Sequence, residues 1–211
     1  MTPDSRILIA PGCPHCGKVT EILTSLVKEG LIGRLEIINL SVRPEAAAEA
    51  GTRSVPWFRI GEFEFTGAHT EGDIRAWAEK AAQGEGWAAY YHDLIDDRAL
   101  NEAIESLHQN PERLGELIQT LSDKELPMVV KIGIGAILED FHDTEPLRRC
   151  IPELTVLLQS DDPALRADAC HYLGLTASAE VIPAIEPLLK DTDPHVREIA
   201  EETLEELNQK D

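Results

Sequence analysis

The sequence is poor in positive charge. Its 211 residues include 19 Lys and Arg but 39 Asp and Glu, which gives a formal net charge of −20 at pH 7. Phosphate backbones and anionic lipid surfaces bind proteins through Lys and Arg contacts that displace counterions. We therefore expect neither nucleic acid nor a membrane among the partners of this protein.

Long hydrophobic runs are missing as well. One of the longest apolar stretches, Val129 to Leu138, is interrupted by Lys131, and it is far shorter than the roughly 20 residues that span a bilayer. Residues 1–6 show no basic segment followed by an apolar core of the length that a signal peptide needs. These two absences predict a cytoplasmic location.

Aromatic residues make up only 5% of the chain, yet 43% of it is hydrophobic, which is enough for one large or two small globular domains. The negative charge is concentrated in one part, because residues 1–82 carry a net charge of −2 and residues 83–211 carry −18. This shift in composition indicates two units with different surfaces. We predict a first domain over residues 1–82, a connecting segment over 83–96 and a second domain over 97–211.

The first domain is predicted to alternate strands and helices. Residues 6–10 form a short apolar run that ends at Pro11 and Gly12, as expected for a buried strand followed by a tight turn. Apolar residues then recur three and four positions apart up to Gly30, which predicts an amphipathic helix. A strand, a helix, a hairpin of two strands and a last helix are predicted at residues 35–40, 44–50, 55–60 with 62–66, and 70–81. The resulting order, βαβαββα, describes an α/β domain.

A Cys-x-x-Cys motif, Cys13-Pro14-His15-Cys16, lies at the junction of the first strand and the first helix. Ser54-Val55-Pro56 opens the third strand, and the hairpin leads into the segment from Phe65 to Glu71. Together with the order of elements, these motifs resemble the minimal thioredoxin fold over about residues 5–82. The domain is most similar to glutaredoxin-like domains, in particular to the half-domains of archaeal protein disulfide oxidoreductases.

The position of the motif indicates a role for each of its residues. Unpaired backbone N–H groups and the dipole at a helix start favour a thiolate, so Cys13 is the expected nucleophile. Cys16 lies one turn later and is expected to resolve the mixed disulfide that Cys13 forms. Pro14 suits the first turn because it lacks an N–H, and His15 is expected to stabilise the Cys13 thiolate. Since Pro-His also separates the cysteines of periplasmic disulfide oxidases, His15 predicts an oxidising site.

The resemblance also assigns a role to the segment around Pro56. It implies that the peptide bond before Pro56 is cis and that Pro56 packs beside the two sulfur atoms. It further implies that the backbone at Val55 binds a substrate chain. Trp57 either borders this substrate-binding groove or belongs to the core of the domain.

Cys13 and Cys16 have two alternative roles. Zinc binding would require two further ligands, but the remaining cysteines, Cys150 and Cys170, stand alone in the other domain. A purely structural disulfide is the second alternative, although a Cys-x-x-Cys at a helix start without a secretion signal is more often catalytic. We therefore predict a redox-active Cys13–Cys16 disulfide with no metal and no other cofactor. A dithiol mechanism is favoured over a glutathione-dependent one. Glutaredoxins use a Gly-Gly or Cys-Asp pair after the hairpin, and this sequence has Gly67-Ala68-His69 there instead.

The second domain contains a sequence repeat. Residues 162–173 align with residues 193–204, and both segments keep Asp-Pro, an aliphatic residue followed by Arg, then Ala and then Leu. The apolar part of this pattern occurs once more at Pro127, Val129, Gly133 and Ile137. These segments resemble HEAT repeats, which implies an all-α solenoid whose stacked helices share one core.

Two further features of the second domain suggest where its surfaces lie. The last helix is rich in glutamate and is predicted to form a polar cap. Trp87, Tyr90 and Tyr91 are predicted either to form the seam between the domains or to pack inside the solenoid.

These features predict a protein thiol–disulfide oxidoreductase whose HEAT-like domain binds a protein substrate or partner. An acidic binding surface would favour basic partners. The alternative is a redox-sensing adaptor, in which the Cys13–Cys16 state changes the affinity for a partner without turnover.

Overall fold

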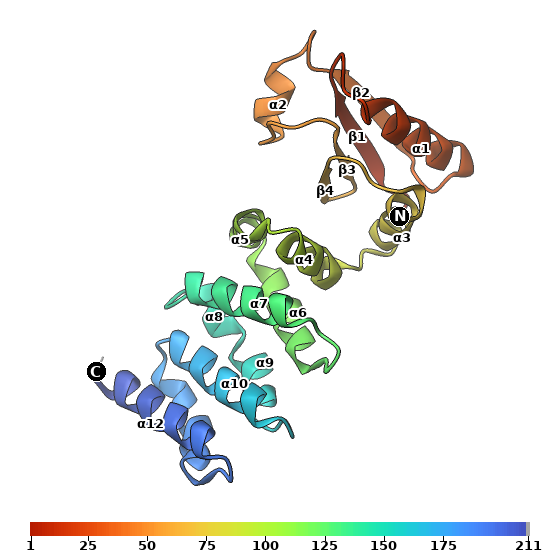
Figure 1. The fold of residues 1–211 in the computed structure, drawn as a ribbon. Helices are drawn as coiled ribbons and strands as arrows, with labels where there is room; N and C mark the ends of the chain where they lie inside the picture. The colour runs from red at the N-terminus through yellow and green to blue at the C-terminus, as the bar shows by residue number, and fades with distance from the viewer. Residues whose placement is uncertain (210–211) are drawn as a thin grey trace. The chain divides into compact units, whose positions relative to one another are not determined.

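Two compact units make up the protein. The computed structural model describes residues 1–209, so Lys210 and Asp211, the last residues of the predicted second domain, lie outside the described part. The chain divides into its two units between Gly86 and Trp87. Figure 1 shows a sheet with helices in the first unit and helices in the second. The sequence predicts this combination of an α/β domain and an α-helical domain.

The first unit has the predicted order βαβαββα, with element ends shifted by a few residues. Its elements are β1 (Asp4–Ile9), α1 (Cys16–Glu29), β2 (Arg34–Asn39), α2 (Glu45–Glu49), β3 (Trp57–Ile60), β4 (Phe63–Thr66) and α3 (Glu71–Gln83). The sheet has the strand order β2-β1-β3-β4. β1 is parallel to β2 and antiparallel to β3, and β3 is antiparallel to β4. The central strand β1 therefore leads directly from the core into the segment that carries the cysteines.

Apolar periodicity explains which faces of the first unit are buried. Ile7 and Leu8 of β1 are fully buried, as are Leu23 and Leu26 of α1. The spacing of three residues between Leu23 and Leu26 places both on the side of α1 that faces the core. This packing holds the start of α1 at the end of the sheet.

Local sequence signals set the helix ends of the first unit. α1 stops before Gly30, which adopts a φ of +79°, and glycine tolerates this left-handed conformation. α3 starts after Thr70, whose hydroxyl accepts a hydrogen bond from the Asp73 N–H while the Asp73 carboxylate accepts one from the Thr70 N–H. This capping box fixes the start of α3, close to the beginning of the helix predicted over residues 70–81.

The second unit consists of short helices that stack on one another. Its elements are α4 (Trp87–Asp96), α5 (Leu100–Gln109), η1 (Pro111–Arg113), α6 (Leu114–Gln119), η2 (Thr120–Ser122), α7 (Met128–Asp140), α8 (Glu145–Arg149), α9 (Ile151–Leu157), α10 (Pro163–Leu175), η3 (Ala179–Val181), α11 (Ile182–Ile185), η4 (Glu186–Lys190) and α12 (Pro194–Gln209). α7 contacts α10, and α10 contacts α12, while α6 contacts α9 in a second row (Figure 1). Stacked rows of this kind bury a continuous core, as repeat proteins require.

The two copies of the sequence repeat begin their helices in the same way. The Asp162 carboxylate accepts a hydrogen bond of 3.0 Å from the Ala164 N–H at the start of α10. The Asp193 carboxylate accepts one of 2.8 Å from the His195 N–H at the start of α12. Each Asp-Pro pair is therefore an N-cap followed by a proline in the first turn.

The arginines of the repeat connect each helix to the loop before it. Arg166 donates to the Ser160 carbonyl at 2.8 Å, and Arg197 donates to the Asp191 carbonyl at 2.7 Å. Both bonds reach back six residues. Arg166 also binds both carboxylate oxygens of Asp191, at 2.8 and 2.7 Å, and thereby joins one repeat to the next.

The third, weaker copy of the repeat keeps its small buried position. Gly133 of α7 is buried, and a Cβ atom there would lie 2.3 Å from Cγ2 of Ile95 in α4. Val129 departs from the pattern, because it is 46% exposed whereas the equivalent Val196 is fully buried. Val129 therefore does not contribute to the core of the second unit.

The predicted connecting segment 83–96 contains a helix of the second unit. α4 contacts α5, α6 and α7, and Tyr91 is fully buried, with its hydroxyl 3.2 Å from that of Ser106. The Arg113 guanidinium stacks over the Trp87 ring, 3.2 Å from its centroid. Of the two alternatives for these aromatic residues, the structure supports packing inside the helical unit.

The last helix has the predicted polar face. Val196, Ala200 and Leu207 of α12 are buried against the preceding helices. The opposite face carries exposed glutamates at positions 198, 201, 202, 205 and 206. This distribution is what a terminal repeat needs, because no further helix covers it among the described residues.

Candidate functional site

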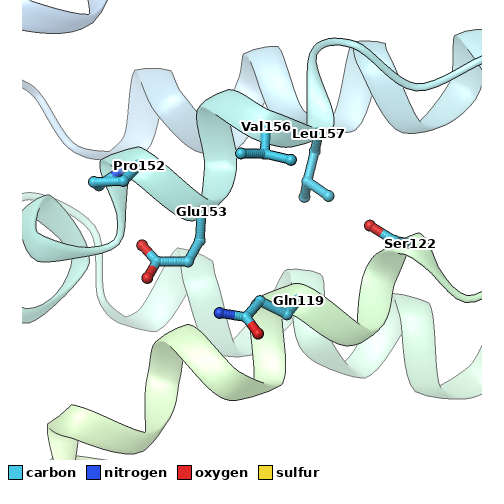
Figure 2. A pocket seen from close by; sticks show the side chains of 6 residues that line it. All are labelled: Gln119, Ser122, Pro152, Glu153, Val156 and Leu157. Carbon is cyan, nitrogen blue, oxygen red and sulfur yellow. The ribbon is translucent and has the colours of Figure 1, made fainter.

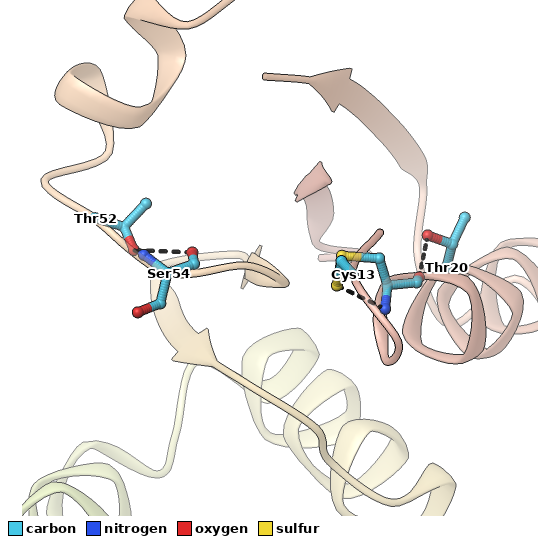
Figure 3. Close-up of a disulfide and its surroundings, with 5 residues drawn as sticks. Cys13, Thr20, Thr52 and Ser54 are labelled. Carbon is cyan, nitrogen blue, oxygen red and sulfur yellow. Dashed lines mark hydrogen bonds between the residues drawn. A yellow bond between two sulfur atoms is a disulfide. The ribbon is translucent and has the colours of Figure 1, made fainter. Parts of the chain in front are cut away.

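The candidate site forms where β1 ends and α1 begins. Cys13 and Cys16 are joined by a disulfide, with their Cα atoms 5.6 Å apart. The Cys16 N–H donates a hydrogen bond of 3.1 Å to the Cys13 sulfur (Figure 3). Regular helix starts at Cys16, so Cys13 occupies the position just before the first turn. Its sulfur therefore receives one of the backbone N–H groups that a helix start leaves without a partner in the helix.

The two cysteines differ in exposure. Cys13 is partly exposed, whereas Cys16 is only 5% exposed. Thr20 donates a hydrogen bond of 2.7 Å to the Cys16 carbonyl one turn later (Figure 3). A protein thiol or disulfide can therefore approach Cys13, while Cys16 lies behind it.

The two residues between the cysteines are on the surface. Pro14 and His15 are both exposed. His15 is the N-cap residue of α1, and its side chain makes no capping hydrogen bond to the helix. The imidazole is thus not committed to holding the backbone in place. Stabilisation of the Cys13 thiolate by His15 stays a prediction.

The segment around Pro56 lies at the same end of the sheet as the disulfide. The Val55–Pro56 peptide bond is cis, as the resemblance implies. Trp57 of β3 pairs with Leu8 of β1 in the antiparallel register, so the residues before Trp57 lie beside those that follow Leu8. The Pro56 carbonyl accepts a hydrogen bond of 2.8 Å from the Gly67 N–H. Val55 is half-buried and Pro56 is buried.

A loop that the sequence analysis did not single out precedes Pro56. The Thr52 hydroxyl accepts a hydrogen bond of 3.2 Å from the Ser54 N–H and donates one of 3.3 Å to the Ser54 carbonyl (Figure 3). Hydroxyl side chains form such local bonds to nearby backbone groups. The Thr-x-Ser spacing before the proline is the signal that would have indicated this loop.

Trp57 belongs to the core of the domain. It is only 4% exposed and packs in a buried cluster with Leu8, Ile38 and Ala46. A ring with so little free surface offers almost no contact to a substrate. The structure therefore corrects the assignment of Trp57 as a substrate-binding residue and supports the core alternative.

His69 packs against aromatic residues rather than lying free on the surface. Its ring meets those of Phe58 and Phe65 edge-on, with centroids 5.4 and 5.5 Å apart. Phe58 and Phe65 pair with each other across β3 and β4. His69 thus covers one end of the hairpin.

The other two cysteines have none of the properties of a reactive site. Cys150 and Cys170 are free and buried. Burial raises the pKa of the Cys150 thiol to about 12 and that of the Cys170 thiol to about 11. Both thiols therefore stay protonated at neutral pH and behave as small apolar side chains.

Neither a candidate metal-ligand group nor a candidate membrane-spanning helix occurs among residues 1–209. No group of three or more His, Cys, Asp and Glu side chains in this range could hold a metal ion. No helix in the same range is long and apolar enough to cross a bilayer. The cytoplasmic location stays a prediction.

Comparison with protein families agrees with the geometry of both units. Residues 5–79 match the family model described as a thioredoxin domain. Residues 151–211 match the model described as HEAT repeats. The chain joins a thioredoxin-like domain to HEAT repeats. No curated protein matches the chain.

The two matches cover the disulfide of the first unit and the sequence repeat of the second. The thioredoxin-like match includes the Cys13–Cys16 disulfide and Pro56. The HEAT match starts at Ile151 and includes both copies of the Asp-Pro-x-x-Arg motif. The thioredoxin-like domain suggests a redox function, and the HEAT repeats suggest binding of a protein partner.

Proposed function

We propose that the protein is a thiol–disulfide oxidoreductase in which Cys13 is the nucleophile and Cys16 is the resolving cysteine. One observation carries the proposal: an accessible Cys13 and a buried Cys16 form a disulfide at the start of α1 in a thioredoxin-like domain. The backbone N–H of Cys16 points at the Cys13 sulfur. A hydrogen bond of this kind would stabilise the thiolate of the reduced site.

The proposed reaction exchanges one disulfide for another. In the reducing direction, the Cys13 thiolate attacks one sulfur of a substrate disulfide, and the other substrate sulfur leaves as a thiolate. The Cys16 thiolate then attacks the Cys13 sulfur, which releases the second substrate thiolate and forms the Cys13–Cys16 disulfide. Two electrons pass from the domain to the substrate, and an external dithiol restores the reduced site. The oxidising direction is the reverse of these steps.

The residues around the cysteines have proposed supporting roles. Backbone groups at Val55, next to Pro56 at the same end of the sheet, would bind an extended substrate segment beside Cys13. Pro14 and His15 are exposed next to Cys13 and would contact the same substrate. His15 would also stabilise the Cys13 thiolate, which favours the reduced form and makes the site more oxidising.

The HEAT repeats are proposed to select the protein substrate. Stacked repeats present extended surfaces on which partners bind, and residues 83–211 carry a net charge of −18. Such a surface attracts basic partners and repels acidic ones.

Turnover separates this proposal from the alternative, a redox-sensing adaptor. We expect the protein to accelerate the reduction of insulin disulfides by dithiothreitol, with many disulfides reduced per protein molecule. Cys13→Ser should lower the rate to that of dithiothreitol alone, whereas Cys150→Ala, which removes a buried thiol of the other unit, should leave the rate unchanged.

The adaptor makes the opposite prediction. It shows no turnover, while its affinity for a partner differs between the oxidised and the reduced protein. Acceleration that persists in Cys13→Ser would contradict both proposals, because each depends on the Cys13–Cys16 pair.

A further inference from the structure

The exposed side of α7 is apolar along its first turns. Met128, Val129 and Ile132 are 69%, 46% and 66% exposed, although all three are large hydrophobic residues. Ile132 follows Met128 by four positions and Val129 by three, so the side chains lie on one face of the helix. These three residues form the apolar group of α7. Single apolar side chains are common on protein surfaces, but a contiguous group is typical of a binding surface.

The helical unit does not need the apolar group for its own core. The core side of α7 consists of other residues, which are at most 2% exposed: Val130, Ile134, Ile137 and Leu138. α4, α5 and α10 all contact α7, yet these neighbours leave the apolar group in solvent. The group is therefore available to a partner.

Carboxylates lie on the same side of the unit as the apolar group. Glu139 and Asp140 end α7, and Asp168 is exposed on α10. α7 and α10 contain a single lysine, Lys131, whose charge partly offsets that of Asp168. The last turn of α7 adds the negative end of its helix dipole. This side of the unit therefore attracts positive charge.

The contact between α7 and α10 brings two of these carboxylates close to the apolar group. Tyr172 of α10 packs on Gly135 of α7, where a Cβ atom would lie 2.9 Å from the tyrosine hydroxyl. Gly135 follows Ile132 by three positions, so this contact lies beside the apolar group. Burial, and after it the charges of Asp168 and Glu139, raise the pKa of Tyr172. Negative charge therefore lies along the α10 side of the apolar group.

The charge of the unit decides what can cover this surface. A second copy of the chain would bring a further net charge of −18 over its residues 83–211, and an anionic lipid surface would be repelled in the same way. A protein segment rich in Lys and Arg is attracted instead. The described part of the helical unit contains no strand that an extended peptide could lengthen. An amphipathic helix, by contrast, binds an apolar surface through residues spaced three and four positions apart.

We propose that the α7 surface, formed by the apolar group and Asp168, binds a basic amphipathic helix of a protein partner. Apolar side chains of that helix cover the apolar group, and its Lys or Arg side chains meet the neighbouring carboxylates. The proposal rests on the partner-binding role proposed for the helical unit and is independent of the chemistry at Cys13.

The test is a titration of the full-length ¹⁵N-labelled protein at physiological salt. The probe is the helical peptide acetyl-Lys-Leu-Ala-Lys-Leu-Leu-Lys-Ala-Leu-Lys-Lys-Leu-Ala-Lys-amide, whose leucines share one face. We expect saturable chemical-shift changes confined to α7 and the adjoining parts of α5 and α10. A peptide of the same composition with scattered leucines keeps the charge but lacks the apolar face, and it should bind at least about tenfold more weakly. No saturable binding, or equal binding of both peptides, would overturn the proposal.

Two matched variants locate the apolar contact. Ile132→Ser should lower the affinity for the peptide at least about tenfold, because it removes the burial of an isoleucine side chain on binding. The control is Val156→Ser, since Val156 is 69% exposed but lies on α9. There it lines a cavity of about 300 Å³ together with Gln119 and Ser122 (Figure 2). Val156→Ser should leave the affinity within about twofold, and equal effects of the two substitutions would contradict the proposal.

A second pair of variants locates the charge. Asp168→Asn should lower the affinity about threefold, because a lysine of the peptide loses a nearby counter-charge. Glu206→Gln removes an exposed glutamate of α12 and should change the affinity less than about 1.5-fold. The assignment to a basic helix is wrong if Asp168→Asn has no effect, or if a peptide with glutamate in place of lysine binds equally well.

Sedimentation equilibrium of the free protein tests a second copy as the occupant. We expect the parent protein and Ile132→Ser to have the same molar mass in solution. Self-association of the parent protein that is lost in Ile132→Ser would overturn the proposal, because the α7 surface would then bind another copy of the chain.

The redox variant separates this proposal from the proposed function. Cys13→Ser should bind the peptide as the parent protein does. Failure of the redox proposal therefore shows as lost turnover with intact peptide binding. Chemical-shift changes that map elsewhere in the helical unit would contradict the α7 surface while leaving a partner-binding role for the unit.

Discussion

At the scale of single residues, the redox proposal depends on the unequal environments of four cysteines. Cys13 is accessible and accepts a backbone hydrogen bond at the start of α1, while Cys16 is shielded behind it. The pKa values of Cys150 and Cys170 are raised by burial. The only pair that can alternate between thiolate and disulfide at neutral pH is therefore Cys13 with Cys16.

We propose that His15 adjusts the redox potential of that pair. We expect His15→Ser to make the reduction potential more negative by about 30 mV or more, because the reduced form loses a group that stabilises its thiolate. About 30 mV corresponds to a tenfold change in the equilibrium constant of a two-electron couple. The potential can be measured by equilibration with glutathione buffers.

A second substitution in α1 serves as a control for the loss of a positive charge. Lys18→Gln removes an exposed cation of α1 that pairs with Glu21 at 3.4 Å, and it should shift the potential much less. A potential of about −270 mV in the parent protein, as in thioredoxin, or no change in His15→Ser, would show that His15 does not make the site oxidising.

Some of the residues near the site could be assigned from the sequence, and others could not. The cysteine motif and Pro56 could be identified because their spacing is itself the signal. Trp57 could not be placed, since a tryptophan beside Pro56 is compatible with a groove or a core, and only the packing of Leu8, Ile38 and Ala46 decides between them.

At the scale of elements, periodic patterns predicted most helices and strands of the first unit. The strand order was not predicted, because it depends on pairing between residues distant in sequence, such as Leu8 with Trp57. α4 was assigned to a connecting segment, since the glycines at 84 and 86 mark a break but do not show which unit the next residues join. Contacts with α5, α6 and α7 settle that question.

The Arg166–Asp191 ion pair links two repeats. Both side chains are largely buried, at 13% and 9% exposure. The pKa of Asp191 is lowered from 3.8 to about 2, mainly by its hydrogen bonds with Arg166 and also by the Asp193 N–H. We expect Arg166→Met to reduce the free energy of unfolding by about 3 kcal/mol, because it leaves a buried carboxylate without its partner. Urea unfolding followed by circular dichroism measures this change.

The free energy of unfolding at acidic pH provides an independent measurement of the Arg166–Asp191 pair. Because the pKa of Asp191 is lowered in the folded state, its contribution is fully present above about pH 4 and is lost as the pH falls towards 2. This contribution amounts to about 2 kcal/mol and should be smaller in Arg166→Met, where the Asp193 N–H still donates a hydrogen bond to Asp191. Arg149→Met serves as the control, since the Arg149–Glu145 pair is exposed and its loss should cost less than about 0.5 kcal/mol. Equal effects of the two substitutions would contradict the assigned role of Arg166.

At the scale of the whole molecule, charge and chemistry are divided between the units. The redox site lies in a unit that is nearly neutral, with a net charge of −2 over residues 1–82, whereas the HEAT repeats belong to the strongly acidic remainder. The net charge of −20 therefore says little about the thiol chemistry. It bears on the partner, because an acidic unit favours basic proteins.

The most direct test of the redox proposal is to trap a mixed disulfide. Cys16→Ser keeps the nucleophile Cys13 but lacks the thiol that releases the product, so the protein expressed in its host should carry substrate proteins covalently bound to Cys13. These proteins should be released by dithiothreitol and be absent from the Cys13→Ser, Cys16→Ser double variant. If nothing is bound to Cys13 in Cys16→Ser, or if the same proteins remain on the double variant, the proposed function is wrong.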